Sequence, residues 1–214
     1  MINIQKTLLV GLTSGLTIVL LACGTADGQE NDQQQVTEMQ TNSRAEAVFA
    51  GGCFWCVEAD FEKLPGVIEA ISGYAGGHAV NPTYQQVVRG GTGHYEAAKI
   101  IYDPSVVSYK ELLEYFWIHV DPTDGGGQFC DRGQSYETAI FATSTQIEIA
   151  QTSKQTLQNS GRLKEDVVTP IITAGPFYKA ETYHQDYYKK NPIRYKYYRN
   201  GCRRDKRIKQ VWGQ

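Results

Sequence analysis

The chain has no large excess of charge of either sign. Its 21 Lys and Arg oppose 23 Asp and Glu, and the formal net charge of the 214 residues is −2. A nucleic-acid-binding protein needs a basic surface to neutralise phosphates, so this balance argues against such a partner. The chain also lacks an internal repeat, and a single compact domain is the expected organisation.

The chain also lacks an apolar run long enough for a comfortable membrane span. Its one such run, residues 7–21, follows Lys6 and fits the core of a signal peptide. The run ends in Leu20-Leu21-Ala22-Cys23-Gly24, a pattern similar to a bacterial lipobox. We therefore expect residues 1–22 to be a lipoprotein signal peptide and Cys23 to be lipidated. An ordinary secretory signal or a short anchor is the alternative.

The segment after the lipobox is polar. Residues 23–45 are rich in Gln and have almost no apolar side chains, so they predict a flexible tether. Residues 46–214 then form the folded domain. This arrangement predicts a bacterial cell-envelope protein that is anchored to the membrane by lipid, in the periplasm or on the outer surface.

Histidine and cysteine are few, with 4 and 5 residues respectively. Besides Cys23 there are Cys53, Cys56, Cys130 and Cys202. A zinc site would need further ligands at compact spacing, so we expect no metal. Export allows disulfides to persist, but a domain of this size folds without them. A Cys-x-x-Cys at the start of a helix is more typical of redox chemistry.

The most informative motif is Gly51-Gly52-Cys53-Phe54-Trp55. A strand-like run at 48–50 precedes it and a helix-like run at 54–64 follows, so the cysteine lies at a strand-to-helix junction. Unpaired N–H groups at a helix N-terminus favour a thiolate. The Phe-Trp pair can wall an apolar pocket. We therefore predict an activated sulfur nucleophile facing a small, partly apolar group.

The remaining pattern predicts an α+β sheet with helices packed on it. Besides residues 48–50, strands are expected at 67–74, 95–102, 136–142 and 167–173. Further helices are expected at 82–88, 144–159 and 180–189, and another begins at a capping box, Ser108 to Glu111. A glycine-rich loop covers 121–133.

Basic residues gather near the C-terminus and alternate with tyrosines, from Tyr187 to Lys209. Such a mixture can bind single-stranded nucleic acid. We expect instead a long irregular segment whose tyrosines pack on the domain, because an exported protein rarely meets nucleic acid.

Several blocks occur in order along the chain. They are Gly51-Gly52-Cys53-Phe54-Trp55, Gly73-Tyr74-Ala75-Gly76-Gly77, Asn81-Pro82-Thr83-Tyr84, Gly93-His94-Tyr95-Glu96, Asp131-Arg132-Gly133-Gln134-Ser135-Tyr136 and Glu181-Thr182-Tyr183-His184. This set resembles the peptide methionine sulfoxide reductases of the A type. The resemblance implies a two-layer α/β sandwich with a ferredoxin-like core and an open cleft. It also implies reduction of the S-epimer of methionine sulfoxide, free or in peptides and proteins, without metal or organic cofactor.

The resemblance also assigns roles. Cys53 attacks the sulfoxide sulfur and becomes a sulfenic acid, while Glu96 acts as the acid that protonates the oxygen. Tyr84 and Tyr136 hydrogen-bond that oxygen. Asp131 positions Tyr136 or a water.

The remaining assignments concern the substrate methyl group and the resolving thiol. Phe54 and Trp55 enclose the methyl group. Cys202 is our first choice for the resolving cysteine, ahead of Cys56 and then Cys130. A thioredoxin-like external dithiol would reduce the resulting disulfide, and we expect a monomer.

Three other interpretations stay open at this point. A thioredoxin-like thiol-disulfide oxidoreductase would use only Cys53 and Cys56. A cysteine hydrolase would pair Cys53 with His94 or His184. A surface lipoprotein would use the tyrosine-rich C-terminus as a binding module.

Overall fold

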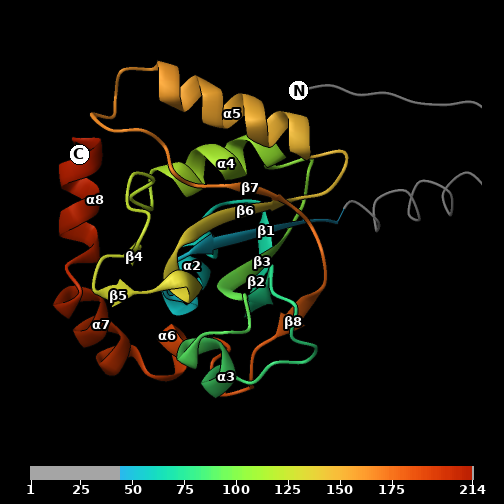
Figure 1. Ribbon diagram of the computed structural model, residues 1–214, viewed down its shortest axis with the longest axis vertical. Helices are drawn as coiled ribbons and strands as arrows, with labels where there is room; N and C mark the ends of the chain where they lie inside the picture. Colours follow the sequence, from blue (N-terminus) through green and yellow to red (C-terminus); the bar gives the residue numbers. More distant parts are fainter. Residues whose placement is uncertain (1–43, 214) are drawn as a thin grey trace, which may run out of the picture. The chain divides into compact units, whose positions relative to one another are not determined.

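A six-stranded sheet forms the centre of the computed structural model, which describes residues 44–213 (Figure 1). The strands run in the order β7-β6-β1-β3-β2-β8. Their bounds are β1 Ala45–Gly51, β2 Val67–Ala75, β3 Tyr95–Tyr102, β6 Thr138–Ala142, β7 Ile171–Thr173 and β8 Phe177–Lys179. The signal peptide, Cys23 and nearly all of the tether predicted above lie outside the described residues.

All neighbouring strands are antiparallel except β6 and β7, which are parallel. β1 and β3 occupy the centre, and Phe49 of β1 opposes Ala98 of β3. β3 has the predicted bounds, because its alternating apolar residues fit one buried face. β6 begins two residues later than predicted, since Gln134–Tyr136 form a short 3-10 helix, η1.

Three helices cover one face of the sheet: α2 Phe54–Phe61, α4 Tyr109–Trp117 and α5 Ile147–Asn159. Side chains from α2 and α4, including Phe61, Leu112 and Phe116, pack with Phe49 and Ile100 of the sheet in the main core. α4 begins at the predicted capping box, in which Ser108 Oγ accepts from the Glu111 amide and Glu111 accepts from the Ser108 amide. These helices fix the end of β1 where Cys53 lies.

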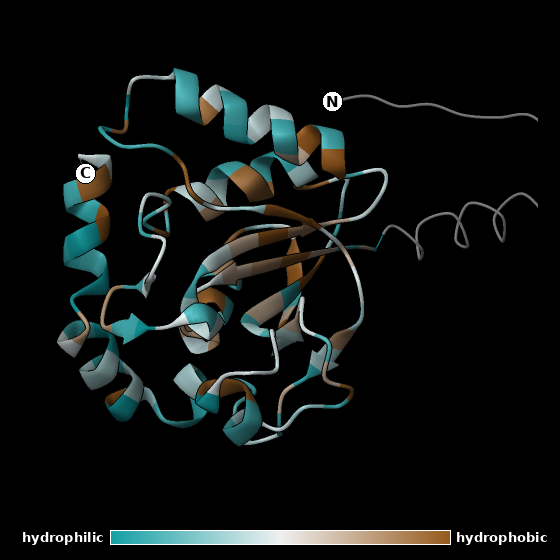
Figure 2. Cartoon of the chain, in the orientation of Figure 1, coloured by the Kyte–Doolittle hydropathy of each residue, from teal (hydrophilic) through white to brown (hydrophobic). Residues whose placement is uncertain are grey.

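The opposite face of the sheet has a smaller core built on alanines. Ala50, Ala97 and Ala139 lie there with Phe141, and Phe177 packs over them. In Figure 2 the strands are mostly brown or pale, whereas α5, α7 and α8 show teal faces. No described helix is long and apolar enough to cross a membrane.

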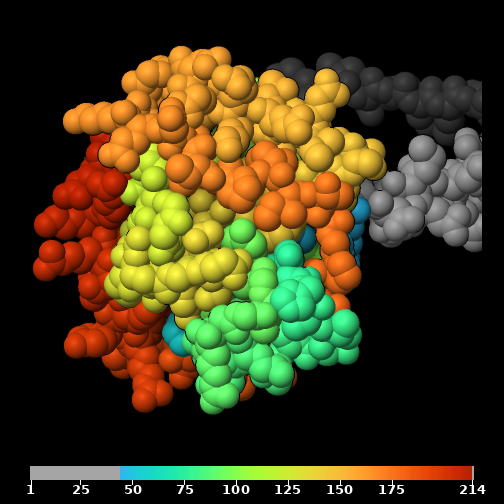
Figure 3. All heavy atoms as spheres, in the orientation of Figure 1, coloured from blue at the N-terminus to red at the C-terminus, as the bar shows by residue number. Residues whose placement is uncertain are grey.

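The C-terminal segment differs from the prediction. It is helical, with α6 Tyr187–Lys190, α7 Pro192–Gly201 and α8 Arg204–Trp212. The expectation of a long irregular tail is therefore wrong, because Pro192 at the first turn of α7 and burial of Ile208 and Trp212 favour helix. Figure 3 shows these red helices lying against the yellow residues of the 121–136 loop.

The predicted helix at 180–189 is also wrong. Gln185 there is buried, and its side chain bonds the Ser72 amide and carbonyl of β2, which holds residues 182–186 in turns. Only the end of this run becomes helix, as α6. The architecture as a whole is mixed α/β, as expected, and its assignment to a ferredoxin-like core stays a prediction.

Candidate active site

Cys53 caps the N-terminus of α2, directly after β1. Gly52 precedes it with φ +82°, and a Cβ at Gly52 would lie 2.6 Å from Gln128 Cβ. Only glycine fits this combination of a left-handed backbone and a close approach. The Gly-Gly pair thus turns the chain from strand to helix and directs Cys53 toward the loops at the end of the sheet.

Cys53 lines a small cavity of about 70 Å³ that also contains the other residues assigned to the reaction. A water molecule occupies about 30 Å³ of liquid, so the cavity suits only a group of a few heavy atoms. The lining side chains come from α2, α3 (Tyr84–Arg89), β3, β5 (Asp131–Arg132), η1 and α7. They are Cys53, Phe54, Trp55, Tyr84, Glu96, Asp131, Tyr136 and Tyr198.

Glu96 lies in β3 and is only 2% exposed. Its Oε2 accepts a hydrogen bond of 3.0 Å from the Phe54 amide. Burial raises the pKa of Glu96 to about 8, against the opposing effect of that hydrogen bond. The carboxyl group is therefore mostly protonated at neutral pH, as an acid catalyst requires.

Two phenols face the same cavity. Tyr84 begins α3, and its amide donates to Glu181 Oε1 at 2.9 Å. Burial raises the pKa of Tyr84 to about 12 and raises the pKa of Tyr136 as well. The Tyr84 and Tyr136 hydroxyl groups are hydrogen-bonded to each other. Both phenols keep their protons and remain hydrogen-bond donors.

Tyr198 of α7 is a site residue that the sequence analysis missed. Its hydroxyl group donates to Asp131 Oδ2 and also hydrogen-bonds Cys53. Asp131 is thus engaged by Tyr198 rather than by Tyr136. The signal was present in the tyrosine-rich C-terminus, but a stretch with five tyrosines does not reveal which one reaches the cysteine.

Cys53 and Cys56 are both free and buried, and their thiols are hydrogen-bonded to each other. Burial raises the pKa of Cys53 well above its ordinary value. The hydrogen bond from Cys53 lowers the pKa of Cys56 to about 7. Burial of Cys53 thus opposes the preference for a thiolate that the N-terminus of α2 provides.

A buried ion-pair network lies one helical turn beyond Cys56. Asp60 contacts Arg199 Nη1 at 3.0 Å and Arg204 Nε at 3.7 Å. Arg204 also donates to the Gly51 carbonyl at 3.0 Å. Both guanidinium groups lower the pKa of Cys56 further, and they attach the C-terminal helices to the start of α2.

The histidines do not pair with Cys53 among the described residues. His184 accepts from Trp55 Nε1 at 3.1 Å, and burial lowers its pKa to about 4. His94 accepts from the Gly77 amide at 3.1 Å and contacts the Ala79 carbonyl. The indole of Trp55 is further fixed by stacking on Tyr187 at 3.7 Å. These contacts favour a structural role for both histidines.

Cys130 and Cys202 form a disulfide with a Cα–Cα distance of 4.8 Å. The first and third choices for the resolving cysteine are thus bonded to each other, and the second, Cys56, is the free thiol beside Cys53. The disulfide joins the 121–136 loop to the end of α7.

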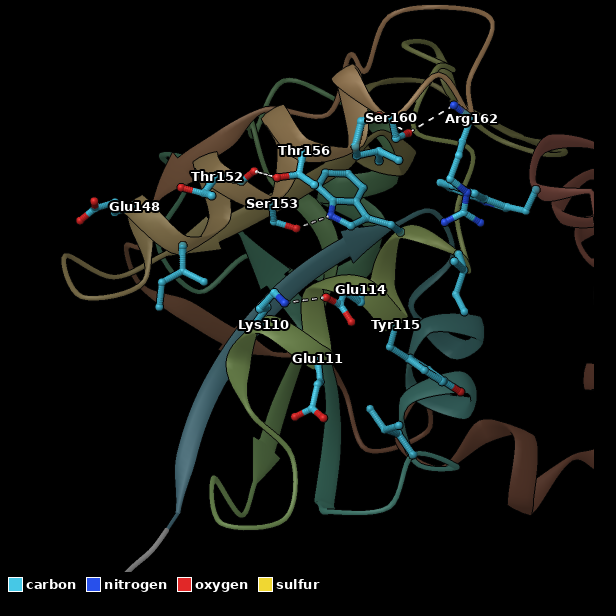
Figure 4. A pocket seen from close by; sticks show the side chains of 16 residues that line it. Lys110, Glu111, Glu114, Tyr115, Glu148, Thr152, Ser153, Thr156, Ser160 and Arg162 are labelled. Carbon is cyan, nitrogen blue, oxygen red and sulfur yellow. Dashed lines mark hydrogen bonds and ion pairs between the residues drawn. The ribbon is translucent and has the colours of Figure 1, made fainter.

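A larger hollow lies elsewhere, between α4 and α5, with a volume of about 820 Å³. Figure 4 shows Lys110 paired with Glu114 and the Thr152, Ser153 and Thr156 side chains on its other side. No cysteine lines it. We therefore place the candidate chemistry in the small cavity at Cys53.

Comparison with known proteins shows the family of the chain. The model of the family described as peptide methionine sulfoxide reductase matches residues 45–214. The chain belongs to that family. A relative named peptide methionine sulfoxide reductase MsrA, from Bacillus licheniformis, is 52% identical over 168 residues, which cover 78% of this chain and 93% of the relative. MsrA 2 of Caulobacter vibrioides is 53% identical over 168 residues, covering 78% and 85%.

Solved structures of the same kind are also similar. Mxr1 from Saccharomyces cerevisiae in reduced form gives a TM-score of 0.67 at 29% identity, covering 72% of this chain and 88% of that one. Methionine sulfoxide reductase A of Corynebacterium diphtheriae gives 0.64 at 31% identity, covering 72% and 77%. As a member of the peptide methionine sulfoxide reductase family, the chain is an oxidoreductase, and the expected family is confirmed.

Proposed function

We propose that this MsrA-type enzyme reduces the S-epimer of methionine sulfoxide, free and in peptides, in the cavity at Cys53. The observation that carries the proposal is the placement of a sulfur nucleophile and a protonated carboxyl group in one small, buried space. The walls from Phe54 and Trp55 suit the methyl group. Tyr84 and Tyr136 donate to the oxygen.

The first step forms a bond between Cys53 sulfur and the sulfoxide sulfur. Glu96 transfers its proton to the oxygen, which makes the oxygen a better leaving group. The proton of Cys53 passes to Cys56 along their hydrogen bond, since Cys56 has a pKa of about 7. Transfer of the hydroxyl group to Cys53 then breaks the substrate S–O bond and the new sulfur–sulfur bond, which releases methionine and leaves a sulfenic acid at Cys53.

Recycling begins with the nearest free thiol. We place Cys56 first, because it is already hydrogen-bonded to Cys53, whereas Cys202 is bonded to Cys130. Condensation of the sulfenic acid with Cys56 forms the Cys53–Cys56 disulfide and water.

The next step transfers the disulfide from the buried pair, Cys53 and Cys56, to the exposed pair, Cys130 and Cys202. It requires that Cys130 and Cys202 start as free thiols. Cys202 attacks the inner disulfide, and Cys130 then displaces the mixed disulfide, giving Cys130–Cys202 and two thiols at Cys53 and Cys56. This is the distribution of thiols in the structure. Tyr198, one turn before Cys202 on α7, already contacts Cys53. A thioredoxin-like dithiol then reduces the Cys130–Cys202 disulfide to two thiols.

Single turnover without reductant tests the scheme. The fully reduced protein should form about one methionine per Cys53 in a first step, with loss of two thiols. Disulfide mapping at successive times should find Cys53–Cys56 before Cys130–Cys202. Direct appearance of Cys53–Cys202 would instead support the first choice made from the sequence, and absence of methionine would refute the function.

We also propose that the protein is a lipoprotein of the bacterial cell envelope and acts as a monomer. The support is the Leu20-Leu21-Ala22-Cys23-Gly24 sequence followed by a polar tether. An exported enzyme repairs oxidised methionine where cytoplasmic reductants do not reach, so its electron donor must itself be maintained across the membrane.

A further inference from the structure

The outer surface of α7 carries apolar groups that the proposed chemistry does not use. Ile193 and Tyr197 lie one helical turn apart and are 85% and 82% exposed. Tyrosine is enriched in protein interfaces, and exposed apolar groups that lie together mark interaction sites.

Four exposed cations lie on the same helix and at the start of the next. Arg194 and Lys196 belong to α7, while Arg203 and Lys206 lie at the start of α8. All four are exposed, and none has an ion-pair or hydrogen-bonding side-chain partner within residues 44–213. The neighbouring Arg199 is instead held by Asp60 and Asp205. A local positive surface thus stands out on a chain whose net charge is −2.

The same surface borders the outer disulfide. Cys202 follows α7 directly, and Cys130 is exposed. A hollow of about 290 Å³ opens beside Cys202, lined in part by Phe129, Arg203 and Lys206. Cys53 and Cys56 are only 6% and 2% exposed. A protein dithiol therefore has access to Cys130–Cys202 and not to the inner pair.

We propose that the α7–α8 face, made of Ile193, Arg194, Lys196, Tyr197, Arg203 and Lys206, is the docking surface for the protein dithiol that reduces Cys130–Cys202. It selects a partner with acidic side chains around its thiols, because complementary charge guides encounter and orientation. The inference rests on the recycling scheme proposed above.

The exchange at this face conserves atoms and electrons. A partner thiolate attacks the exposed Cys130 sulfur, forming a mixed disulfide and breaking the bond to Cys202. Cys202 leaves as a thiolate beside Arg203, whose positive charge stabilises it, and it then takes up a proton. The second partner thiol attacks the mixed disulfide, which frees Cys130 and leaves the partner oxidised by two electrons.

An anionic membrane also attracts basic residues mixed with exposed apolar ones. Docking on lipid through this face would cover the accessible disulfide, so the position of Cys130–Cys202 favours the protein partner. Vesicle binding serves as the alternative outcome of the test.

Steady-state kinetics with two reductants test the docking surface. The full chain would reduce a methionine sulfoxide peptide with either thioredoxin, kept reduced by its reductase and NADPH, or dithiothreitol. One variant combines Lys196→Glu with Lys206→Glu, and a second combines Ile193→Ser with Tyr197→Ser. Lys164→Glu is the control, because Lys164 is exposed and belongs to the loop after α5. In the same loop, Arg162 lies over Trp212, at the opposite end of α8 from the proposed surface.

Both double variants should raise KM for thioredoxin by about tenfold, and the charge variant should also weaken its dependence on salt. Turnover with dithiothreitol and all kinetics of the control should match the wild type. Wild-type KM values for thioredoxin in both variants would overturn the docking surface, whether or not the variants lose binding to phosphatidylglycerol vesicles. No turnover of the wild type with dithiothreitol would instead refute the proposed function.

Discussion

Replacing Glu96 with Gln tests whether its protonated carboxyl group is the acid. Gln keeps the shape and the acceptor for the Phe54 amide but has no proton to transfer. We expect single-turnover reduction to slow by about 10²- to 10⁴-fold, the usual contribution of a positioned acid. In the wild type, the rate should fall as pH rises through about 8, where Glu96 loses its proton. The residual rate of Glu96→Gln should lack this decline.

The same substitution has a consequence for stability with a definite sign. The pKa of Glu96 rises from an ordinary 4.5 to about 8 on folding. Between these pH values the unfolded chain releases the proton and the folded chain retains it, so stability decreases as pH rises. At pH 7, which lies 2.5 units above the ordinary pKa of 4.5, the loss in the free energy of unfolding is about 3 kcal/mol, at 1.36 kcal/mol per unit. The Glu96→Gln variant should not show this loss in the free energy of unfolding.

Denaturant unfolding at several pH values measures the effect, with all cysteines kept reduced. The stability advantage of Glu96→Gln should be near zero at pH 4.5, grow toward pH 8 and then level off. Glu58→Gln is a matched control. Glu58 is also buried in α2 with a pKa raised to about 7, but it does not line the cavity. It should show a similar trend in stability with normal activity. A stability difference for Glu96→Gln that does not change with pH would refute the assigned protonation.

Further outcomes concern the sulfur chemistry and the anchor. Cys53→Ser should abolish methionine formation in the peptide assay, and activity equal to the wild type would refute the mechanism. Cys56→Ser should form methionine more slowly, because the proton acceptor for Cys53 is lost, and should accumulate sulfenic acid, detected by dimedone labelling and mass spectrometry. Tyr198→Phe removes the hydroxyl group that contacts both Asp131 and Cys53 and should slow single turnover by about tenfold at pH 7. Cys23→Ser should prevent incorporation of labelled fatty acid in cells, whereas Cys130→Ser should not.

Local signals explain what the sequence predicted well. β3 and the Ser108 capping box depend on neighbouring residues, and both occur where expected. Long-range contacts explain the failures. Gln185 binds β2 and prevents the helix predicted at 180–189, a contact between residues 113 positions apart. The role of Tyr198 likewise depends on the packing of α7 beside Cys53, which no spacing in the sequence reveals.

Two effects on the ionisation of Cys53 oppose each other. A helix N-terminus favours a thiolate, but the same position is buried beside Glu96, and burial raises the pKa of both groups. Two anions in so small a cavity would repel each other strongly. The reaction avoids this by moving protons instead of creating charge: Glu96 gives its proton to the oxygen, and Cys53 gives its proton to Cys56. Cys56 therefore serves twice, first as the acceptor of a proton and then as the thiol that closes the disulfide, which accounts for a second cysteine within one turn of the first.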